Sequence, residues 1–213
     1  MTKEEKEIKY ENALRPGQKF YVFWKNIIGF FGAFVGISIF ALPMLVIAII
    51  IKCTSKGPIF FRQERVGKNK KVFTLIKFRS MRADAPEIPP SEMTPEQQKA
   101  MEYKFGNFLR KTSLDELPQL FNIFIGQMAF IGPRPGAAHN EEELIALREK
   151  YHPTAYLVKP GLSGHAQIAM RRDHDPEKKA YHDAYYVKHL SLWFDIKVFV
   201  KSCLCAVGLY KGR

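Results

Sequence analysis

The chain has 213 residues, 46% of them hydrophobic, and a formal net charge of +12 at pH 7. This length and composition exclude wholesale disorder and suffice for one domain with a buried core. The excess of lysine and arginine indicates an anionic partner, which could be a nucleic acid, a phosphorylated substrate or an acidic lipid surface.

The cysteines argue against a disulfide framework, and the histidines argue against a zinc site. The three cysteines, Cys53, Cys203 and Cys205, form no CxxC pair and leave an odd count. A disulfide framework is therefore not expected, and the main domain is predicted to face a reducing compartment. The six histidines lack the spacing of a zinc site.

The N-terminal part of the chain predicts a membrane segment. Residues 1–20 carry mixed charges and the breaker Pro16-Gly17, so we expect a lead-in there. Residues 27–51 form an uncharged, mostly apolar run of about 25 residues, longer than the roughly 20 that a spanning helix needs. A cleaved signal peptide is a poor alternative, because the run begins too far into the chain and lacks a small-residue cleavage site before the next domain. We expect residues 21–55 to bind the membrane and residues 56–213 to form a separate domain.

Pro43 interrupts the expected membrane helix. It removes the backbone hydrogen bond to the carbonyl of Ile39 and costs about 3 kcal/mol or more in a regular helix, so we expect a bend there. The hydroxyl of Ser38 is a candidate to satisfy the freed carbonyl. Basic residues flank both ends of the segment, so charge does not favour a crossing. The residues alone leave open a proline-kinked spanning helix and a re-entrant helix that returns to the side it entered from.

The rest of the chain predicts a mainly helical α+β domain. A β-hairpin is expected from residues 58–66 and 71–78, which are rich in β-branched and aromatic residues around residues 67–70. A proline-rich loop is expected at residues 83–95. Helical patterns follow near residues 96–110, 117–125, 141–151 and 176–190. The apolar segment at residues 190–210 fits either a core helix or a helix in the membrane interface.

Two adjacent carboxylates, Asp115 and Glu116, stand out in so basic a chain. Ser113 and Glu116 have the spacing of a capping box, so the pair could simply start a helix. Pro118 argues for a helix that starts closer to Leu117. The positive end of that helix is then expected to lower the pKa of the preceding carboxylate, which would keep it ionised as a nucleophile or metal ligand.

Four cations lie at the ends of predicted elements around the acid pair: Lys77, Arg79, Arg110 and Arg134. Arg134 stands between two prolines, so a stiffened loop presents its guanidinium. That fork matches phosphate oxygens bidentately. We therefore interpret the four cations as candidates for binding the phosphates of a substrate.

Four segments carry a resemblance to a known family. They are residues 77–81 (KFRSM), 110–122 (RKTSLDELPQLFN), 126–135 (GQMAFIGPRP) and 159–164 (KPGLSG). In sequence, order and spacing they resemble the bacterial sugar transferases, the monotopic phosphoglycosyl transferases, over roughly residues 20–208. The chain looks like the minimal form of the family.

The resemblance implies an enzyme that starts a glycan on a lipid carrier. Asp115 would attack the β-phosphate of a UDP-sugar, release UMP and hold the phosphosugar until polyprenyl phosphate, typically undecaprenyl phosphate, accepts it. Glu116, with Asp115, would hold Mg²⁺. The resemblance also implies a re-entrant helix broken at Pro43, at the cytoplasmic face of the bacterial inner membrane. It implies no nucleic-acid partner and leaves a homodimer possible.

Two further positions, Lys159 and Gln167, are implied as substrate contacts. Lys159 stands where the family usually has arginine, and the segment around Gln167 departs from the family pattern, so the sugar stays undefined. Asp173 and Asp175 resemble the DxD metal site of glycosyltransferases that release UDP, or they belong to a solvated loop. A basic, membrane-anchored binding module is the non-enzymatic alternative.

Overall fold

The computed structural model describes residues 13–83, 94, 96, 101–136, 141–170, 173 and 175–206. Its helices are α2 (Pro16–Thr54), α4 (Lys104–Lys111), α5 (Gln119–Phe124), α6 (Glu141–Glu149), α7 (His165–Ala169), α8 (Pro176–Lys188) and α9 (Leu192–Ala206), with the short 3₁₀ turns η1 (Lys68–Lys70), η3 (Leu114–Glu116) and η5 (Ala155–Leu157). Its strands are β1 (Phe60–Val66), β2 (Val72–Phe78), β3 (Ala129–Ile131) and β4 (Gly161–Ser163). The mainly helical α+β class and the small hairpin are confirmed.

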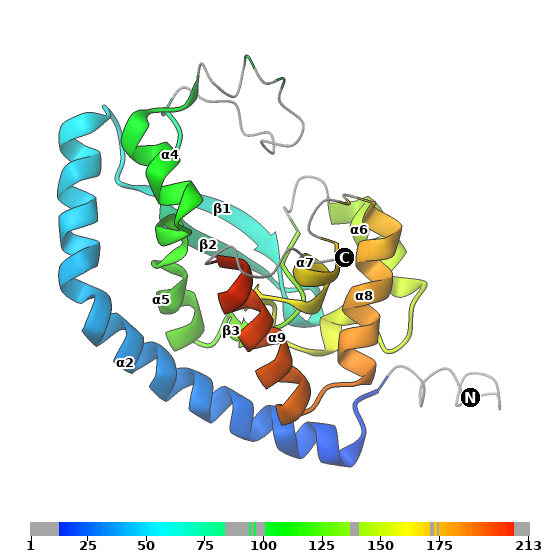
Figure 1. The fold of residues 1–213 in the computed structure, drawn as a ribbon. Helices are drawn as coiled ribbons and strands as arrows, with labels where there is room; N and C mark the ends of the chain where they lie inside the picture. The colour runs from blue at the N-terminus through cyan, green and yellow to red at the C-terminus, as the bar shows by residue number, and fades with distance from the viewer. Residues whose placement is uncertain are drawn as a thin grey trace.

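Helix α2 forms a long, bent arm along one side of the molecule, with the other elements on the inside of its curve (Figure 1). It begins at Pro16, earlier than expected, because a proline fits the first helical position, where its missing N–H has no partner to lose. Pro43 lies inside the helix without ending it. The expectation for Ser38 is wrong, because its hydroxyl donates to the carbonyl of Phe34, at 3.0 Å, and not to that of Ile39.

Three apolar clusters connect α2 to the rest of the protein along its length. Tyr21 and Val22, near its start, pack on the cluster of β3, α8 and α9. Ala33, in its middle, packs with α5 and β2. Ile47 and Ile51, near its end, pack with β2 and α4. Both ends of the helix therefore rest on the same domain.

The outward side of α2 is apolar and exposed. Its exposed large side chains include Phe20, Phe23, Trp24, Ile28, Phe31, Phe34, Ile39, Leu42, Leu45 and Ile49. By length and composition it is the one helix in the described chain apolar enough to cross a membrane. Helix α9 buries Val198 in the core and exposes Leu192, Trp193 and Phe199, so the choice between a core helix and an interface helix at residues 190–210 stays open.

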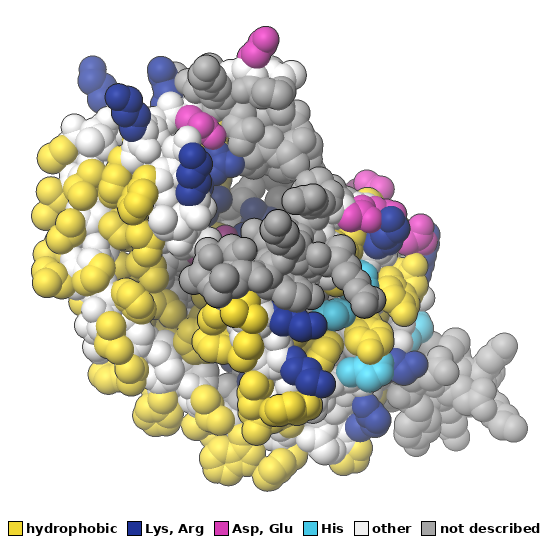
Figure 2. All heavy atoms as spheres, in the orientation of Figure 1, with side chains coloured by type: hydrophobic (Ala, Val, Ile, Leu, Met, Phe, Trp, Pro, Cys, Tyr) yellow, Lys and Arg dark blue, Asp and Glu magenta, His cyan; other side chains and the backbone are white. Residues whose placement is uncertain are grey.

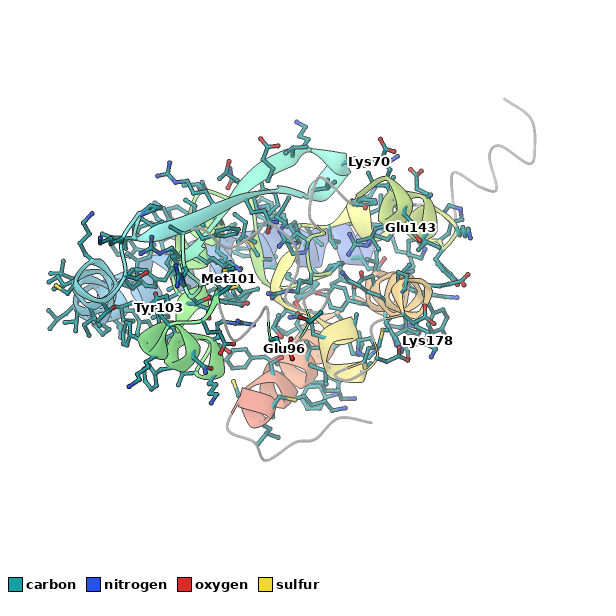
Figure 3. All side chains as sticks on the ribbon, turned by 90° about the horizontal axis from the view of Figure 1, so that it is seen from above. Lys70, Glu96, Met101, Tyr103, Glu143 and Lys178 are labelled. Carbon is teal, nitrogen blue, oxygen red and sulfur yellow. The ribbon has the colours of Figure 1, made fainter. Side chains whose placement is uncertain are left out.

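The strands form two separate two-stranded sheets. The antiparallel hairpin pairs Phe60 with Phe78 and Val66 with Val72. The second pair, β3 with β4, is parallel and was not predicted from the sequence, because three-residue strands carry too little periodicity. Figure 3 shows Lys70 at the tip of the hairpin, on the side of α6, where it pairs with Glu149.

The other predicted helices are found close to their expected bounds, as α5, α6 and α8. The pattern at residues 96–110 corresponds to α4, which starts at Lys104, and residues 97–100 lie outside the described chain. Most of the predicted proline-rich loop and the first twelve residues of the lead-in also lie outside it.

Asn122 of α5 ties this helix to the edge of β2. Its carboxamide oxygen accepts from the Ile76 N–H at 3.1 Å, and its nitrogen donates to the Thr74 carbonyl and to Gln127, each at 2.7 Å. We predict that Asn122→Leu lowers the free energy of unfolding by about 2–4 kcal/mol, because it leaves buried backbone groups without partners. Denaturant unfolding of both proteins measures this, and a loss below about 0.5 kcal/mol would contradict the role of the tie.

Candidate active site

The acid pair lies in η3, one turn before α5, as the position of Pro118 predicted. The capping-box alternative is wrong, because the Ser113 side chain makes no cap hydrogen bond and its backbone is left-handed, with φ 57°. Asp115 is buried, with 7% of its surface exposed, while Glu116 is half-buried. The turn therefore places one carboxylate inside the protein and its neighbour at the rim.

The pKa of Asp115 is raised to about 6, mainly by burial and in second place by the negative charge of Glu116. Lys77, a backbone N–H and Arg110 act in the opposite direction without cancelling the effect. The expectation that a helix end would lower this pKa is therefore wrong. Desolvation of a buried carboxylate outweighs the partial charge of a six-residue helix.

Arg134 is the closest cation to the pair. Its guanidinium donates to Glu116 Oε1 at 2.6 Å and to the carbonyl of Leu162 at 3.3 Å. The charge of Glu116 in turn raises the pKa of Arg134. The proline-flanked loop after β3 thus presents a guanidinium to Glu116, while phosphate binding by Arg134 stays a prediction.

The loop of Arg134 is fixed to the strand that leads into α7. The Gly132 N–H donates to the Ser163 carbonyl, and the Gly161 N–H donates to the Pro133 carbonyl, both at 2.9 Å. A side chain on Gly132 would collide with the backbone of Lys159 and Gly161, so only glycine permits this approach.

Lys77 lies among both carboxylates and two guanidinium groups. Burial lowers its pKa, Arg134 and Arg65 act in the same direction, and the two carboxylates oppose them. Its ammonium also lies 4.9 Å from the centre of the Phe61 ring. Arg110 adds a fourth cation, which acts on Asp115 and pairs with Glu102 at 3.4 Å.

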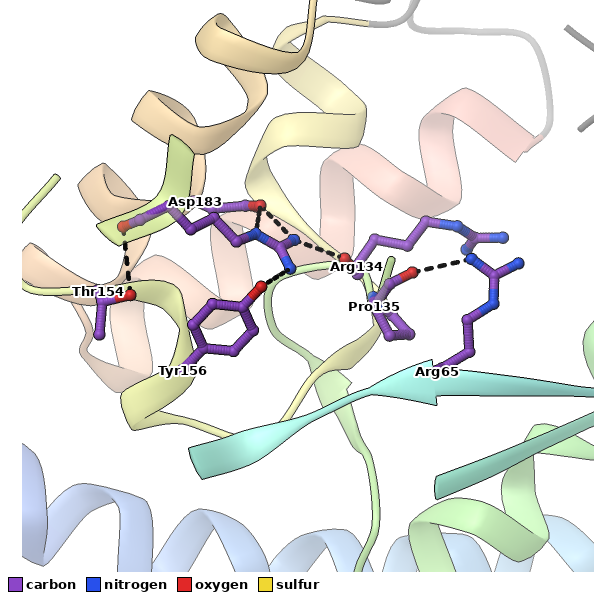
Figure 4. A network of polar contacts seen from close by, with 7 residues as sticks. Arg65, Arg134, Pro135, Thr154, Tyr156 and Asp183 are labelled. Carbon is purple, nitrogen blue, oxygen red and sulfur yellow. Dashed lines mark hydrogen bonds and ion pairs between the residues drawn. The ribbon is translucent and has the colours of Figure 1, made fainter. Parts of the chain in front are cut away.

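Arg65 is a site residue that the sequence interpretation missed. It donates to the carbonyl of Pro135 at 3.2 Å, and Figure 4 shows its guanidinium beside that of Arg134. The signal was present, because the two-residue period of β1 places Arg65 on the inward face with Phe61 and Gln63. Four cations thus act on a group of three carboxylates, Asp115, Glu116 and Glu102, and the excess of positive charge suits an anionic phosphate substrate.

Three predicted contacts form no hydrogen bond or ion pair with the acid pair among the described residues. Arg79 is buried and donates to the carbonyls of Ser55 and Lys56, at 2.7 and 2.8 Å, so it holds the end of α2. Lys159 lines a cavity beside α2. Gln167 lies in α7, and its buried side-chain oxygen has no hydrogen-bond partner among the described residues.

Asp173 and Asp175 cap a helix. Asp175 accepts from the backbone N–H groups of Glu177 and Lys178 at the start of α8, and Asp173 pairs with the Lys178 ammonium at 2.7 Å. This arrangement supports the loop interpretation over the DxD metal site. Across the described residues, no group of three or more His, Cys, Asp or Glu side chains is placed to hold a metal ion.

A buried ion pair between Arg148 and Asp183 supports the backbone of the Arg134 loop (Figure 4). Arg148 and Asp183 are 2% and 1% exposed and form a salt bridge at 2.7 Å. Arg148 also donates to the backbone carbonyl of Arg134 at 2.8 Å and to the Tyr156 hydroxyl at 3.4 Å. Sequence reasoning missed this pair, because α6 and α8 are distant in the chain.

Comparison with known proteins identifies similar sequences. Residues 20–208 match a family model described as bacterial sugar transferase. A UDP-glucose:undecaprenyl-phosphate glucose-1-phosphate transferase of Xanthomonas campestris pv. campestris is 39% identical over 78% of this chain and 35% of its own length. A UDP-N-acetylgalactosamine-undecaprenyl-phosphate N-acetylgalactosaminephosphotransferase of Aeromonas hydrophila is 35% identical over 85% of this chain and 43% of its own length.

A third relative, an undecaprenyl-phosphate galactose phosphotransferase of Salmonella typhimurium, is 34% identical over 78% of this chain and 37% of its own length. The chain therefore spans less than half the length of these curated relatives.

Asp115 destabilises the fold when it is ionised. Its pKa is raised from 3.8 to about 6 on folding, so the stability of the protonated form is fully present below about pH 4 and is lost as the pH rises through about 6. We predict that Asp115→Asn unfolds with a free energy about 2–3 kcal/mol higher than wild type at pH 8, without added metal, and that the difference vanishes near pH 4.

Denaturant unfolding at both pH values measures this difference. Glu143→Gln, at an exposed carboxylate of α6, serves as the charge-matched control and should follow the wild type at both values. Equal stability of Asp115→Asn and wild type at pH 8 would show that the carboxylate carries no burial penalty.

Arg148→Met is expected to cost about 3–5 kcal/mol, because it leaves the Asp183 carboxylate buried without its partner. Arg148→Met with Asp183→Leu should cost less than the single change, since no buried charge then remains. Lys178→Met removes an exposed pair and should cost under about 1 kcal/mol. Thermal unfolding of the four proteins tests the set, and a double variant no more stable than Arg148→Met would contradict the ion-pair account.

Proposed function

Because this chain belongs to the bacterial sugar transferase family, we propose that it moves a phosphosugar from a UDP-sugar to polyprenyl phosphate and releases UMP. One observation carries the proposal: a buried carboxylate, Asp115, lies beside a second acid in a group of charges that includes Lys77, Arg110, Arg134 and Arg65. The named relatives act on UDP-sugars and undecaprenyl phosphate, which supports the same substrate classes here.

The first step forms a covalent enzyme intermediate. An oxygen of the Asp115 carboxylate attacks the β-phosphorus of the UDP-sugar, and the bond from that phosphorus to the bridging oxygen breaks. UMP leaves with the bridging oxygen, and the phosphosugar stays on Asp115 as an acyl phosphate. Arg134, Arg110, Lys77 and Arg65 would hold the phosphate oxygens and oppose the charge that develops on the leaving group.

The second step frees the aspartate. A phosphate oxygen of polyprenyl phosphate attacks the same phosphorus, the bond from phosphorus to the Asp115 oxygen breaks, and a polyprenyl diphosphate sugar leaves. Because the raised pKa of Asp115 is about 6, the free carboxylate is predominantly ionised at neutral pH and can serve as the nucleophile.

The two acids also suit the Mg²⁺ implied by the resemblance. Magnesium is commonly held by one or two carboxylates together with substrate phosphates, and a bound cation would relieve the repulsion by Glu116 that helps raise the pKa of Asp115. When bound, the ion would neutralise part of the negative charge of the diphosphate. Asp115 and Glu116 would hold it, while Arg134 keeps Glu116 oriented.

We further propose that α2 enters the membrane and returns to the cytoplasmic face. A helix that crossed a bilayer would carry one end away from the domain, whereas both ends of α2 pack on it. Figure 2 shows hydrophobic side chains along the left and lower edges of the molecule, over the region of α2 and α9. This supports an orientation in which the two helices face lipid and the acid pair meets soluble UDP-sugar.

The nucleotide released tests the reaction. Purified protein is incubated with Mg²⁺, undecaprenyl phosphate and a panel of UDP-sugars, and we expect UMP. Release of UDP would indicate glycosyl transfer, and release of neither would leave a binding module. Asp115→Asn should lower turnover at least about a thousandfold because the nucleophile is lost, while Glu143→Gln, on the exposed side of α6, should retain wild-type turnover.

A further inference from the structure

A cavity of about 160 Å³ lies between α2 and the end of α5, at the start of β3. Asn26 and Phe30 of α2 line one side, and Ile125 and Gly126 line the other. Its remaining polar lining comes from Lys25 and Lys159. The cavity therefore combines apolar walls with two ammonium groups.

The two lysines differ in their hydrogen-bond and ion-pair partners. Lys25 is paired with the Asp195 carboxylate and the Tyr186 hydroxyl, each at 2.6 Å. Lys159 is half-buried and has no hydrogen bond or ion pair with any described residue. Burial and the charge of Lys68 lower the pKa of Lys159, so its cation lacks a compensating anion.

The Lys159 ammonium lies beside Gly126. Gly126 adopts φ +83°, and a Cβ at this position would lie 3.4 Å from the Lys159 nitrogen. The ammonium thus lies against the turn at the end of α5, on the lining of the cavity. An anion entering the cavity would meet this free charge and the carboxamide of Asn26.

Exposed apolar side chains lie on and beside the lining of the cavity. Ile28 and Phe31 of α2 are 63% and 60% exposed, and Ile125 at the end of α5 is 61% exposed. Ile28 and Phe31 belong to the side of α2 that faces lipid in the orientation proposed above, and Ile125 is part of the cavity lining. A hydrated free phosphate would have to shed water against such walls, whereas a lipid brings its own apolar part.

The cavity is separate from the active site. The acid pair precedes the start of α5, and the cavity lies at its far end; six helical residues alone span about 9 Å. Neither carboxylate is among the charges that shift the pKa of Lys159. A phosphate held at Lys159 is therefore not the one that reacts at Asp115.

We propose that this cavity binds the phosphate headgroup of an anionic glycerophospholipid, with Lys159 as its counter-ion. The inference rests on the proposed membrane orientation of α2. The bound lipid fixes the contact between α2 and α5 and so holds the active site at the depth of the headgroups.

The test compares full-length wild type, Lys159→Gln and Lys52→Gln in vesicles of phosphatidylcholine with rising phosphatidylglycerol. Lys52, an exposed lysine in the last turn of α2, is the charge-matched control. We expect phosphatidylglycerol to raise the unfolding temperature of wild type and Lys52→Gln with saturation, and that of Lys159→Gln not at all. An equal rise in all three proteins would overturn the proposal.

A photoactivatable phosphatidylglycerol probes the wild-type protein directly, so the test does not depend on the folding of Lys159→Gln. Mass spectrometry should find the crosslink on peptides that line the cavity, and a crosslink found only elsewhere would overturn the proposal. Displacement by inorganic phosphate, or by polyprenyl phosphate but not by unlabelled phosphatidylglycerol, would also overturn it. Failure to sediment with any vesicle would instead refute the membrane orientation on which it rests.

Discussion

The whole structure depends on one constraint, which is that a 39-residue apolar helix packs along its length on a single small domain. Burying the inner side of α2 against α5, β2, α8 and α9 supplies much of the domain's core, and hydrophobic burial is the main favourable contribution to folding. The same packing leaves the outer side without a protein partner. The exposed apolar side and the buried side therefore belong to one element, and neither can be altered alone.

The active site uses this scaffold to keep a carboxylate in an unfavourable environment. Asp115 is buried beside Glu116, and the surrounding cations only partly compensate for the lost hydration. The loop that carries Arg134 stays in position because the buried Arg148–Asp183 pair holds its backbone. The domain thus gives up stability at Asp115 and recovers it through packing and ion pairs elsewhere, a common pattern at functional sites.

The sequence predicts the features that depend on local patterns. The apolar run of α2, the hairpin and helices α5, α6 and α8 follow from hydrophobic period and breakers. The acid pair and Arg134 were found because motif and charge mark them. What the sequence could not reveal depends on tertiary contacts, as with the buried guanidinium of Arg79, the raised pKa of Asp115 and the β3–β4 pair. Arg65 is predictable only in part. The two-residue period of β1 indicates which face of the strand it lies on, but not which residues lie beside it.

The hydrogen bonds between the Arg134 loop and the strand that leads into α7 make these two segments a single mechanical unit. Glycine at position 132 leaves no side-chain layer between the two backbones to absorb a displacement. A ligand that shifts α7 would consequently shift the guanidinium that contacts Glu116. The position of α7 and the charge balance at the two carboxylates are thereby coupled through these backbone hydrogen bonds.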